Sequence, residues 1–453
     1  MRILLITHYY APEFGAPQRR WSALIQRFVA AGHQVTVAAP VPHYPSGRPT
    51  AQQRRDHRVG AVERGEHGET VVRTAYLPHR SDIGTRTADH VVAAADSLRR
   101  LLSRFARPGT RPDVVIATAP AIPSLLVGRV LALHWKVPLV AEMRDAWPDL
   151  VTHVGPAGAV PVELAHAASP DPLRPDPLRP NRQLLPPLRK GLGLLIGYAK
   201  GAVHHTVTHW QQGAQTVVTT TGRFAEVLRE RGIAEPQVVR NGTDLDGVRA
   251  QDDHAPGDHP ELRCLYLGNM GRSQGLDTLV RAAARLRDQG VPIEVRMIGH
   301  GVEAPSLAAL AHELGAPVQV LPRIEHSDVE EQYAWADTVV VSLRGWAPFA
   351  WTVPSKLYEL LATRRHVTAL LDGEAAEVVR EAGAGDVLAP QDEDALVRLW
   401  GRLAADRSLA AVRDSGRAWV AEHADDDVLA ARYLGMLEDV VRGNTMEGRT
   451  AGA

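Results

Sequence analysis

The sequence has little of several features that often point directly to a function. It holds one cysteine, Cys264, which excludes an internal disulfide; its apolar surroundings predict a small core residue rather than a reactive thiol. Acidic and basic residues number 52 and 51, a balance that argues against broad electrostatic binding to nucleic acid. The 20 histidines show no spacing typical of zinc sites, so we expect no tightly bound metal.

Long hydrophobic runs are missing as well. The most apolar run, residues 192–203, contains Lys200 and is shorter than the roughly 20 residues that a membrane-spanning helix needs. The opening run, residues 2–7, is too short for a signal peptide and lacks a cleavage site. We therefore expect a cytoplasmic protein.

Short apolar runs alternate with helical patterns through the first half of the chain. The runs are continuous rather than alternating, which predicts strands of a parallel sheet covered by helices on both faces. A helix is expected over 21–31, ended by Gly32, with others over 90–105 and 124–133. The expected strands are residues 2–7, 35–37, 71–76, 114–118, 137–142 and 216–219.

The second half repeats this scheme, so the fold class is α/β with two doubly wound, Rossmann-like domains. Strands are expected over 263–267, 294–298, 318–321, 338–341 and 367–371, and helices over 277–287, 306–314, 329–334, 355–361 and 375–382. Residues 252–260 are rich in Asp, His, Pro and Gly and predict a linker between domains at 1–251 and 261–422.

One stretch of the first domain breaks the alternation. Residues 170–180 contain Pro-Asp-Pro-Leu-Arg twice, which predicts an exposed, extended insertion near 155–190. The stretch 184–202 combines leucines with Arg and Lys. It fits either a helix that packs on the first domain or an element at a membrane surface, and both alternatives stay open.

In doubly wound sheets, ligands bind beyond the carboxyl ends of the strands. The loop after the first strand, residues 8–20, contains Tyr10 and Glu13 and has Gly15 and Arg19 where a helix begins. Backbone N–H groups and an arginine at that place fit an anionic ligand, although an ordinary turn with solvated arginines fits equally well.

The loop after the first strand of the second half gives a stronger signal. Gly268, Asn269, Gly271, Arg272 and Gly275 lie between an apolar strand and a helix. Glycines let a diphosphate approach the backbone, and the helix dipole favours its charge. We expect phosphate binding here.

A second candidate opens the helix expected at 355. Pro354 precedes it, Ser355 is the expected N-cap, and Lys356 lies in the first turn, where a cation opposes the helix dipole and so suggests an anionic ligand. Glu359 lies three residues on, where its carboxylate fits both hydroxyls of a ribose. The alternative is an ordinary surface Lys–Glu pair. Gly299 closes another strand and fits a turn that shapes the site.

Charged residues also end a strand of the first domain. Arg144 and Asp145 follow the strand at 137–142 and are expected to line a cleft, or else to form a structural salt bridge. The acidic clusters 392–394 and 425–427 are expected to cap and flank helices rather than to bind metal.

Taken in order, these segments resemble glycosyltransferase family 4, which has the GT-B fold of two Rossmann-like domains facing across a cleft. The resemblance rests on the opening strand with its Gly15 loop and on residues 32–37, 144–149, 238–246, 268–275, 333–337 and 354–359. It is similar to the bacterial branch that assembles O-antigen, capsule and exopolysaccharide.

The resemblance implies a retaining glycosyltransferase that needs no metal and no cofactor beyond its nucleoside-diphosphate sugar donor. The second domain would hold the donor, with Arg272 and Lys356 neutralising the diphosphate and Glu359 binding ribose. The first domain would bind an acceptor sugar, glycolipid or other hydroxyl compound, with contact to the inner membrane surface. A helix at 423–442 would return to the first domain before a tail at 443–453. The remaining implied contacts are Arg323 and Ser355 to the donor and Tyr10, Glu13 and Arg19 to the acceptor.

The chain also departs from the family pattern. Trp351 stands where the family's first paired glutamate is expected, and Asn269 and Gln274 replace two cations of the donor loop. Many relatives carry His where Arg144 stands. Three other functions stay open: a nucleotide-sugar epimerase of the same fold, a dinucleotide-dependent oxidoreductase, and an inactive nucleotide-sugar-binding subunit. The absence of Gly-x-Gly-x-x-Gly after the first strand counts against the oxidoreductase.

Overall fold

A computed structural model describes residues 1–80, 83–144, 204–252 and 259–450, without the side chains of Ile83 and of 445–450. The chain forms two units, each with its own parallel sheet. Unit 1 comprises Met1–Thr220, Phe224–Val239 and Ala430–Ala453, and unit 2 comprises Thr221–Arg223 and Arg240–Leu429. The main passage between them lies at Val239 and Arg240, before the linker expected at 252–260, most of which lies outside the described residues.

The sheet of unit 1 has the strand order β3-β4-β2-β1-β5-β6-β7-β8, and all of its neighbours are parallel except β3 and β4. Its central strands are fully buried, as their continuous apolar runs predict. The strands are β1 (Arg2–Ile6), β2 (Gln34–Pro40), β3 (Val62–Arg64), β4 (Thr70–Thr74), β5 (Val114–Thr118), β6 (Leu139–Met143), β7 (Thr216–Thr219) and β8 (Gln237–Val238).

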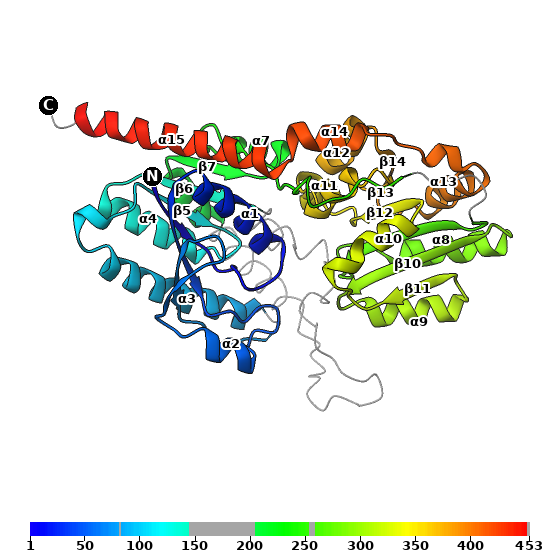
Figure 1. The fold of residues 1–453 in the computed structure, drawn as a ribbon, viewed down its shortest axis with the longest axis horizontal. Coiled ribbons are helices and arrows are strands. Elements are labelled where there is room, and N and C mark those ends of the chain that lie inside the picture. Colours follow the sequence, from blue (N-terminus) through cyan, green and yellow to red (C-terminus); the bar gives the residue numbers. More distant parts are fainter. Residues whose placement is uncertain (81–82, 145–203, 253–258, 451–453) are drawn as a thin grey trace, which may run out of the picture. The chain divides into compact units, whose positions relative to one another are not determined.

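Helices α3 and α4 pack together against this sheet, and α1 packs against the returning helix α15 through Trp21, Phe28 and Tyr433 (Figure 1). All three of these rings are almost completely buried. The helices of unit 1 are α1 (Ala16–Ala30), α2 (Ala51–Asp56), α3 (Ile83–Arg104), α4 (Pro123–Trp135), α7 (Gly222–Glu230), which begins in unit 2, and α15 (Asp426–Thr450), which also begins there.

Unit 2 has a wholly parallel sheet with the order β11-β10-β9-β12-β13-β14. Its strands are β9 (Leu262–Asn269), β10 (Ile293–His300), β11 (Val318–Leu321), β12 (Thr338–Ser342), β13 (His366–Leu370) and β14 (Gly385–Leu388). Its helices are α8 (Asp277–Asp288), α9 (Ala304–Leu314), α10 (Val329–Trp335), α11 (Ser355–Ala362), α12 (Gly373–Ala382), α13 (Glu393–Ala405) and α14 (Ser415–His423).

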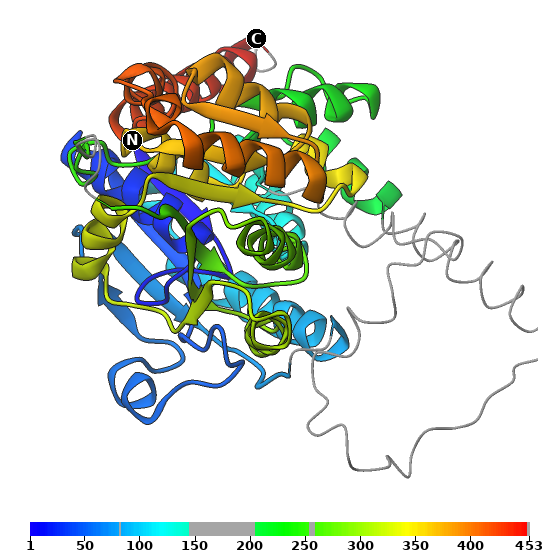
Figure 2. The ribbon, with the colours of Figure 1, turned by 90° about the vertical axis from the view of Figure 1, so that its right-hand side faces the viewer.

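Successive residues of these strands feed two separate cores, one on each face of the sheet. Leu265 belongs to the core under α10–α12 and α14, whereas Cys264 and Tyr266 belong to the core under α8, α9 and α13. Figures 1 and 2 show helices on both sides of the strands. Because both faces are covered, the strands read as unbroken apolar runs in the sequence. Cys264 is completely buried, and burial raises the pKa of its thiol, which confirms a core role.

The structure corrects several local predictions. The first helix begins at Ala16 rather than Trp21, because it starts directly after Gly15 with Pro17 in its first turn. Sequence patterns missed α2, β3 and β8, which are short, and also α7, β14 and α14, and they gave no bounds for α13. Asp392 caps α13 by accepting a hydrogen bond from the backbone N–H of Ala395 (2.9 Å), as its acidic cluster predicted.

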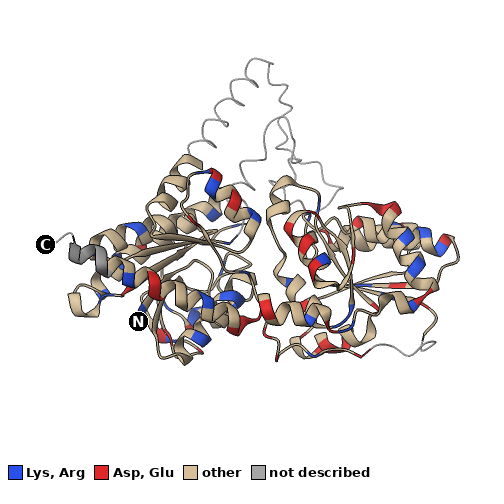
Figure 3. Ribbon diagram, turned by 90° about the horizontal axis from the view of Figure 1, so that it is seen from above, with Lys and Arg blue, Asp and Glu red and all other residues tan. Residues whose placement is uncertain are grey.

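Among the described residues, no helix combines the length and apolarity that crossing a bilayer requires. Lys and Arg are interspersed with Asp and Glu over the helices of both units (Figure 3), in keeping with the balanced composition. The insertion at 155–190, the stretch 184–202 and Asp145 lie outside the described residues.

Candidate functional site

Hydrogen bonds from the end of β12 and from Arg344 hold the glycine loop between β9 and α8 in place. Ser342 Oγ donates to the carbonyl of Gln274 (2.6 Å), and the backbone N–H of Arg344 donates to the carbonyl of Ser273 (2.8 Å). Gly275 has φ +61°, and a Cβ there would lie 3.2 Å from Arg344 Cγ. The loop is therefore a preformed turn whose glycine is required by conformation.

Arg272 lies at the centre of this loop. The Arg344 guanidinium donates through Nε to the Arg272 carbonyl (2.7 Å) and through Nη2 to Asp277 (3.2 Å). These two bonds fix the position of the Arg272 backbone, and they do not involve the Arg272 guanidinium. Its Nη1 atom is buried and has no hydrogen-bond partner among the described residues. A buried guanidinium N–H without a partner is costly unless a ligand or water satisfies it.

The second candidate segment opens α11. Pro354 is the N-cap and Ser355 is the first helical residue, so the predicted N-cap role of Ser355 is wrong. Lys356 Nζ contacts Glu359 Oε1 at 2.8 Å, and the Tyr333 hydroxyl donates to the same oxygen at 2.7 Å. The side chains of Lys356 and Glu359 are 30% and 12% exposed. The two predicted binding residues are thus paired with each other, half-buried and reachable.

Glycines lie next to the last residues of β9 and β10. Gly299 lies beside Gly268 in the parallel register, and a Cβ on Gly299 would lie 1.8 Å from the Gly268 carbonyl oxygen. The sheet itself therefore explains Gly299, whereas a Cβ on Gly268 would meet only the Tyr266 hydroxyl, at 3.3 Å. Asn269 is exposed at the end of β9, and its carbonyl accepts a hydrogen bond from the Tyr266 hydroxyl (2.6 Å). Arg323 is exposed on the loop after β11.

Sequence reasoning missed the loop between β12 and α11. It encloses a cavity of about 50 Å³ lined in part by Arg344, Trp346, Phe349 and Asp372, and the Trp346 and Phe349 rings stack at 5.3 Å. Trp351 lies near the end of this loop, and its carbonyl accepts a hydrogen bond from the Thr221 hydroxyl (2.6 Å). The signal that could have found the loop is its place after a buried strand, next to the segment at 354–359.

In unit 1, the residues predicted to bind the acceptor substrate differ in their exposure to solvent. The Tyr10 hydroxyl donates to Glu69 (2.7 Å), and burial together with Glu69 raises the pKa of Tyr10. Glu13 Oε1 accepts from the backbone N–H groups of His43 (2.7 Å) and Tyr44 (2.9 Å). Both side chains are buried and hold their own loops, whereas Arg19 is exposed.

Gly15 is the N-cap of α1 in an extended conformation that any residue can adopt, so no left-handed backbone requires glycine there. A Cβ would lie 2.5 Å from the side-chain oxygen of Gln18, which is buried and donates through its amide nitrogen to Glu13 (3.1 Å). The packing of the buried Gln18 side chain therefore accounts for glycine at this position, and the ligand contact predicted for Gly15 stays a prediction.

Arg144 lies in a buried charged network at the carboxyl end of β6. Glu142, which is 0% exposed, accepts from Arg20 Nε (3.0 Å) and from the Tyr433 hydroxyl (2.9 Å), and Arg144 Nε lies 3.9 Å away. Burial, with a further contribution from Glu142, raises the pKa of Tyr433. At 3.9 Å the contact between Arg144 and Glu142 is an ion pair without a hydrogen bond, so both interpretations of Arg144 stay open.

Part of the sequence of unit 2 matches a known protein family. Residues 261–406 match the family described as glycosyl transferases group 1. A protein named as a colanic acid biosynthesis glycosyl transferase, WcaI of Escherichia coli K12, is 24% identical over 378 residues, covering 80% of this chain and 81% of its own. D-inositol 3-phosphate glycosyltransferase of Mycobacterium sp. (strain KMS) is 36% identical over 139 residues, covering 28% of this chain and 32% of its own.

Solved structures match over nearly the whole chain. Sucrose-phosphate synthase from Thermosynechococcus elongatus superimposes with a TM-score of 0.69 at 17% identity, covering 98% of this chain and 99% of its own. Anabaena HepE in complex with UDP and glucose gives a TM-score of 0.61 at 14% identity, covering 96% and 99%. The fold is GT-B. Together with the match of residues 261–406 to glycosyl transferases group 1, the fold supports glycosyltransferase activity.

Proposed function

We propose that this chain is a retaining glycosyltransferase that moves a sugar from a nucleoside-diphosphate sugar to a hydroxyl group of a sugar or glycolipid acceptor in surface-polysaccharide assembly. The observation that carries the proposal is the buried Nη1 of Arg272, which has no partner among the described residues and lies in a glycine loop that opens α8. A diphosphate oxygen there would accept the missing hydrogen bond and meet the positive end of the helix dipole.

Lys356 would supply the second positive charge. In the structure its ammonium group is paired with Glu359, and a diphosphate would compete for that ammonium. Glu359 keeps its bond from the Tyr333 hydroxyl, so its carboxylate would stay in position to accept hydrogen bonds from ribose hydroxyls. The paired state therefore fits a site whose charges satisfy one another until the donor arrives.

The chemistry we propose needs no protein nucleophile. The bond between the sugar C1 and the diphosphate oxygen breaks, the bond from C1 to the acceptor oxygen forms on the same face, and the acceptor proton passes to the departing phosphate. Arg272 and Lys356 stabilise the charge that grows on that phosphate. Holding donor and acceptor in register supplies the remaining rate enhancement. Within this proposal neither a metal ion nor a redox cofactor takes part in the transfer.

The first test is thermal unfolding of the full chain with UDP, GDP, dTDP, ADP and NAD. A ligand that binds only the folded state raises the melting temperature with concentration. We expect a selective shift with one nucleoside diphosphate; the HepE complexes with UDP and UDP-glucose make UDP the first choice. A shift with NAD alone would favour an oxidoreductase, and no shift with any ligand would remove the proposal's basis.

Product analysis then separates transfer from epimerisation. Incubation of the matching nucleotide sugar with an acceptor should yield a glycoside of unchanged anomeric configuration by NMR. An altered free nucleotide sugar formed without acceptor would instead show an epimerase. Binding without any product, across a broad acceptor panel, would show the inactive subunit.

A further inference from the structure

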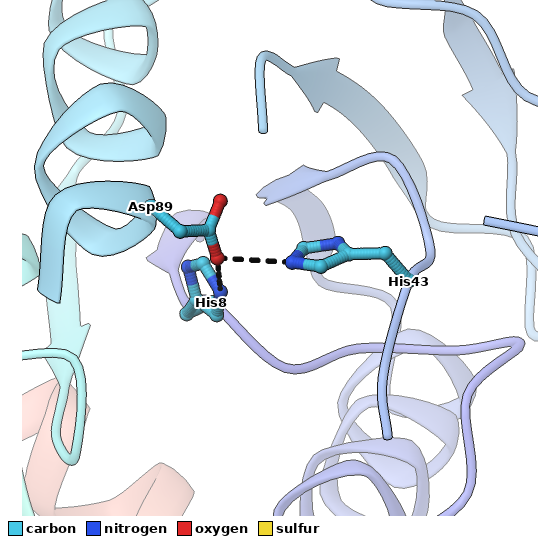
Figure 4. A group of neighbouring side chains, drawn as sticks. All are labelled: His8, His43 and Asp89. Carbon is cyan, nitrogen blue, oxygen red and sulfur yellow. Dashed lines mark hydrogen bonds and ion pairs between the residues drawn. The ribbon is translucent and has the colours of Figure 1, made fainter. Parts of the chain in front are cut away.

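Two histidines and an aspartate converge in the interior of unit 1. His8 follows β1, His43 follows β2 and Asp89 lies in α3, and Figure 4 shows both imidazoles directed at the carboxylate. His8 Nε2 and His43 Nε2 each lie 3.0 Å from the same oxygen, Asp89 Oδ2. Their three side chains are 3%, 2% and 0% exposed. The three candidate ligand atoms lie within 4.8 Å of one another.

The surrounding hydrogen bonds orient these groups. His43 Nδ1 donates to the carbonyl of Val41 (2.7 Å), which directs Nε2 inward. The other oxygen of Asp89, Oδ1, accepts the backbone N–H of Leu77 (2.7 Å), which leaves Oδ2 to the histidines. Metal-binding histidines usually donate their second ring N–H to a backbone carbonyl or a carboxylate in this way, because it fixes ring orientation and the tautomer.

A fourth imidazole lies at the edge of the cluster. His79 Nδ1 donates to the carbonyl of Arg80 (2.7 Å), and its Nε2 lies 3.9 Å from Asp89 Oδ2. The His79 and His43 rings meet edge to face at 5.6 Å, and the His79 side chain is 8% exposed. His79 thus presents the same backbone-fixed Nδ1 and inward Nε2 as His43, at a distance that a small side-chain movement would close.

We propose that His8, His43 and Asp89 bind a zinc ion in unit 1, with His79 as the fourth ligand. Two or three imidazoles with one carboxylate form a donor set suited to Zn²⁺, which favours four tetrahedral ligands where a site is structural. The burial of the cluster excludes contact with a sugar substrate, so the metal stabilises the fold. This site would overturn the expectation of no tightly bound metal, which considered only ligand spacing within short segments.

Such a metal would join the loop after β1 to the loop after β2 and to α3. The same two loops already meet through Glu13, which accepts from the backbone N–H groups of His43 and Tyr44. The ion would therefore brace the loop that carries Gly15 and Arg19. All four ligands belong to unit 1, so this inference does not depend on the proposed transferase chemistry.

The test is the metal content of the full chain, made without a histidine tag, incubated with Zn²⁺ and passed over a chelating resin. We expect about one zinc ion per chain, measured by inductively coupled plasma mass spectrometry. His43→Gln and Asp89→Asn should each reduce it at least about tenfold, since ligand changes remove metal–protein bonds. The matched control is His67→Gln, a histidine of the same unit whose Nε2 lies 2.7 Å from Ser22 Oγ; it should keep the full metal content.

Cobalt gives a second readout that does not depend on stability. Co²⁺ added to the metal-free wild type should give the strong visible absorption of a tetrahedral site, and Zn²⁺ should remove it. Metal-free wild type should still fold, because the cluster is hydrogen-bonded within itself, and Zn²⁺ should raise its melting temperature. Three results would each overturn the proposal: the wild type holds no zinc after loading, Co²⁺ gives no visible band, or the wild type and His43→Gln bind equal amounts of metal.

Discussion

The two units carry charged side chains at the carboxyl edges of their sheets, but they use them differently. In unit 1, Arg20 and Tyr433 both donate to Glu142, and this network is almost completely shielded from water. In unit 2, Lys356 and Glu359 stay partly exposed, and Arg272 keeps a donor atom without a partner among the described residues. The carboxyl edge of unit 1 thus holds buried charges that bond to one another, which we call the consolidated network. The carboxyl edge of unit 2 holds partly exposed charges that we propose bind a ligand.

This difference gives a criterion for separating structural from functional charges. A charge whose hydrogen-bonding capacity is met by buried protein groups stabilises the fold and resists a new partner. A half-buried charge with an incomplete set of partners gains more from an incoming ligand. Substitutions in the Arg20–Glu142 network should therefore change stability, and substitutions of Arg272, Lys356 or Glu359 should change binding and turnover.

The largest effect is expected in the consolidated network. Glu142→Gln leaves Arg20 buried beside a neutral amide, which should lower the free energy of unfolding by about 3–5 kcal/mol, as measured by urea denaturation. The double variant Arg20→Met/Glu142→Gln removes both charges and should recover much of that loss. Equal stability of Glu142→Gln and wild type would show that the network does not stabilise unit 1.

Lys356→Ala should chiefly affect turnover. Loss of a cation that stabilises the leaving diphosphate should reduce kcat about 100- to 1,000-fold, with unfolding unchanged. Lys136→Asn is the control: this exposed lysine ends α4 in a left-handed conformation that asparagine tolerates, so activity should be kept. Unchanged kcat and nucleotide affinity in Lys356→Ala would return the residue to an ordinary surface pair.

Glu359→Gln should weaken nucleoside-diphosphate binding by about 1–3 kcal/mol, because the amide replaces a charge-assisted acceptor for ribose. Isothermal titration gives the dissociation constant directly. Tyr333→Phe removes only the supporting bond to Glu359 and should have a smaller effect. A dissociation constant in Glu359→Gln equal to that of wild type would contradict the ribose assignment.

The smallest effect concerns a purely structural acid of unit 2. Asp392→Ala removes the N-cap of α13 and should cost about 1 kcal/mol of unfolding free energy. Nucleotide binding should be unaffected. A loss of binding in this variant would show that stability and ligand affinity are coupled within unit 2, and would weaken the contrast between the two edges.

The sequence predicted the parallel strands well because burial on both faces leaves unbroken apolar runs. It also located the glycine loop at 268–275 and the start of α11, since both follow local turn and helix signals. It could not predict that Arg20, Glu142 and Tyr433 meet, because these partners lie 122 and 291 positions apart. For the same reason, no local spacing reveals His8, His43 and Asp89 as neighbours.

The path of α15 has a consequence for biosynthesis. Tyr433 fills the core of unit 1 and donates to Glu142, yet it is made after the whole of unit 2. Domains generally fold as they leave the ribosome, N-terminal parts first. Here the unit whose sheet is synthesised first must wait, with Trp21 and Phe28 uncovered, until unit 2 has been made. The nascent chain therefore carries an unfinished apolar surface, which we expect chaperones to shield until Tyr433 has been made.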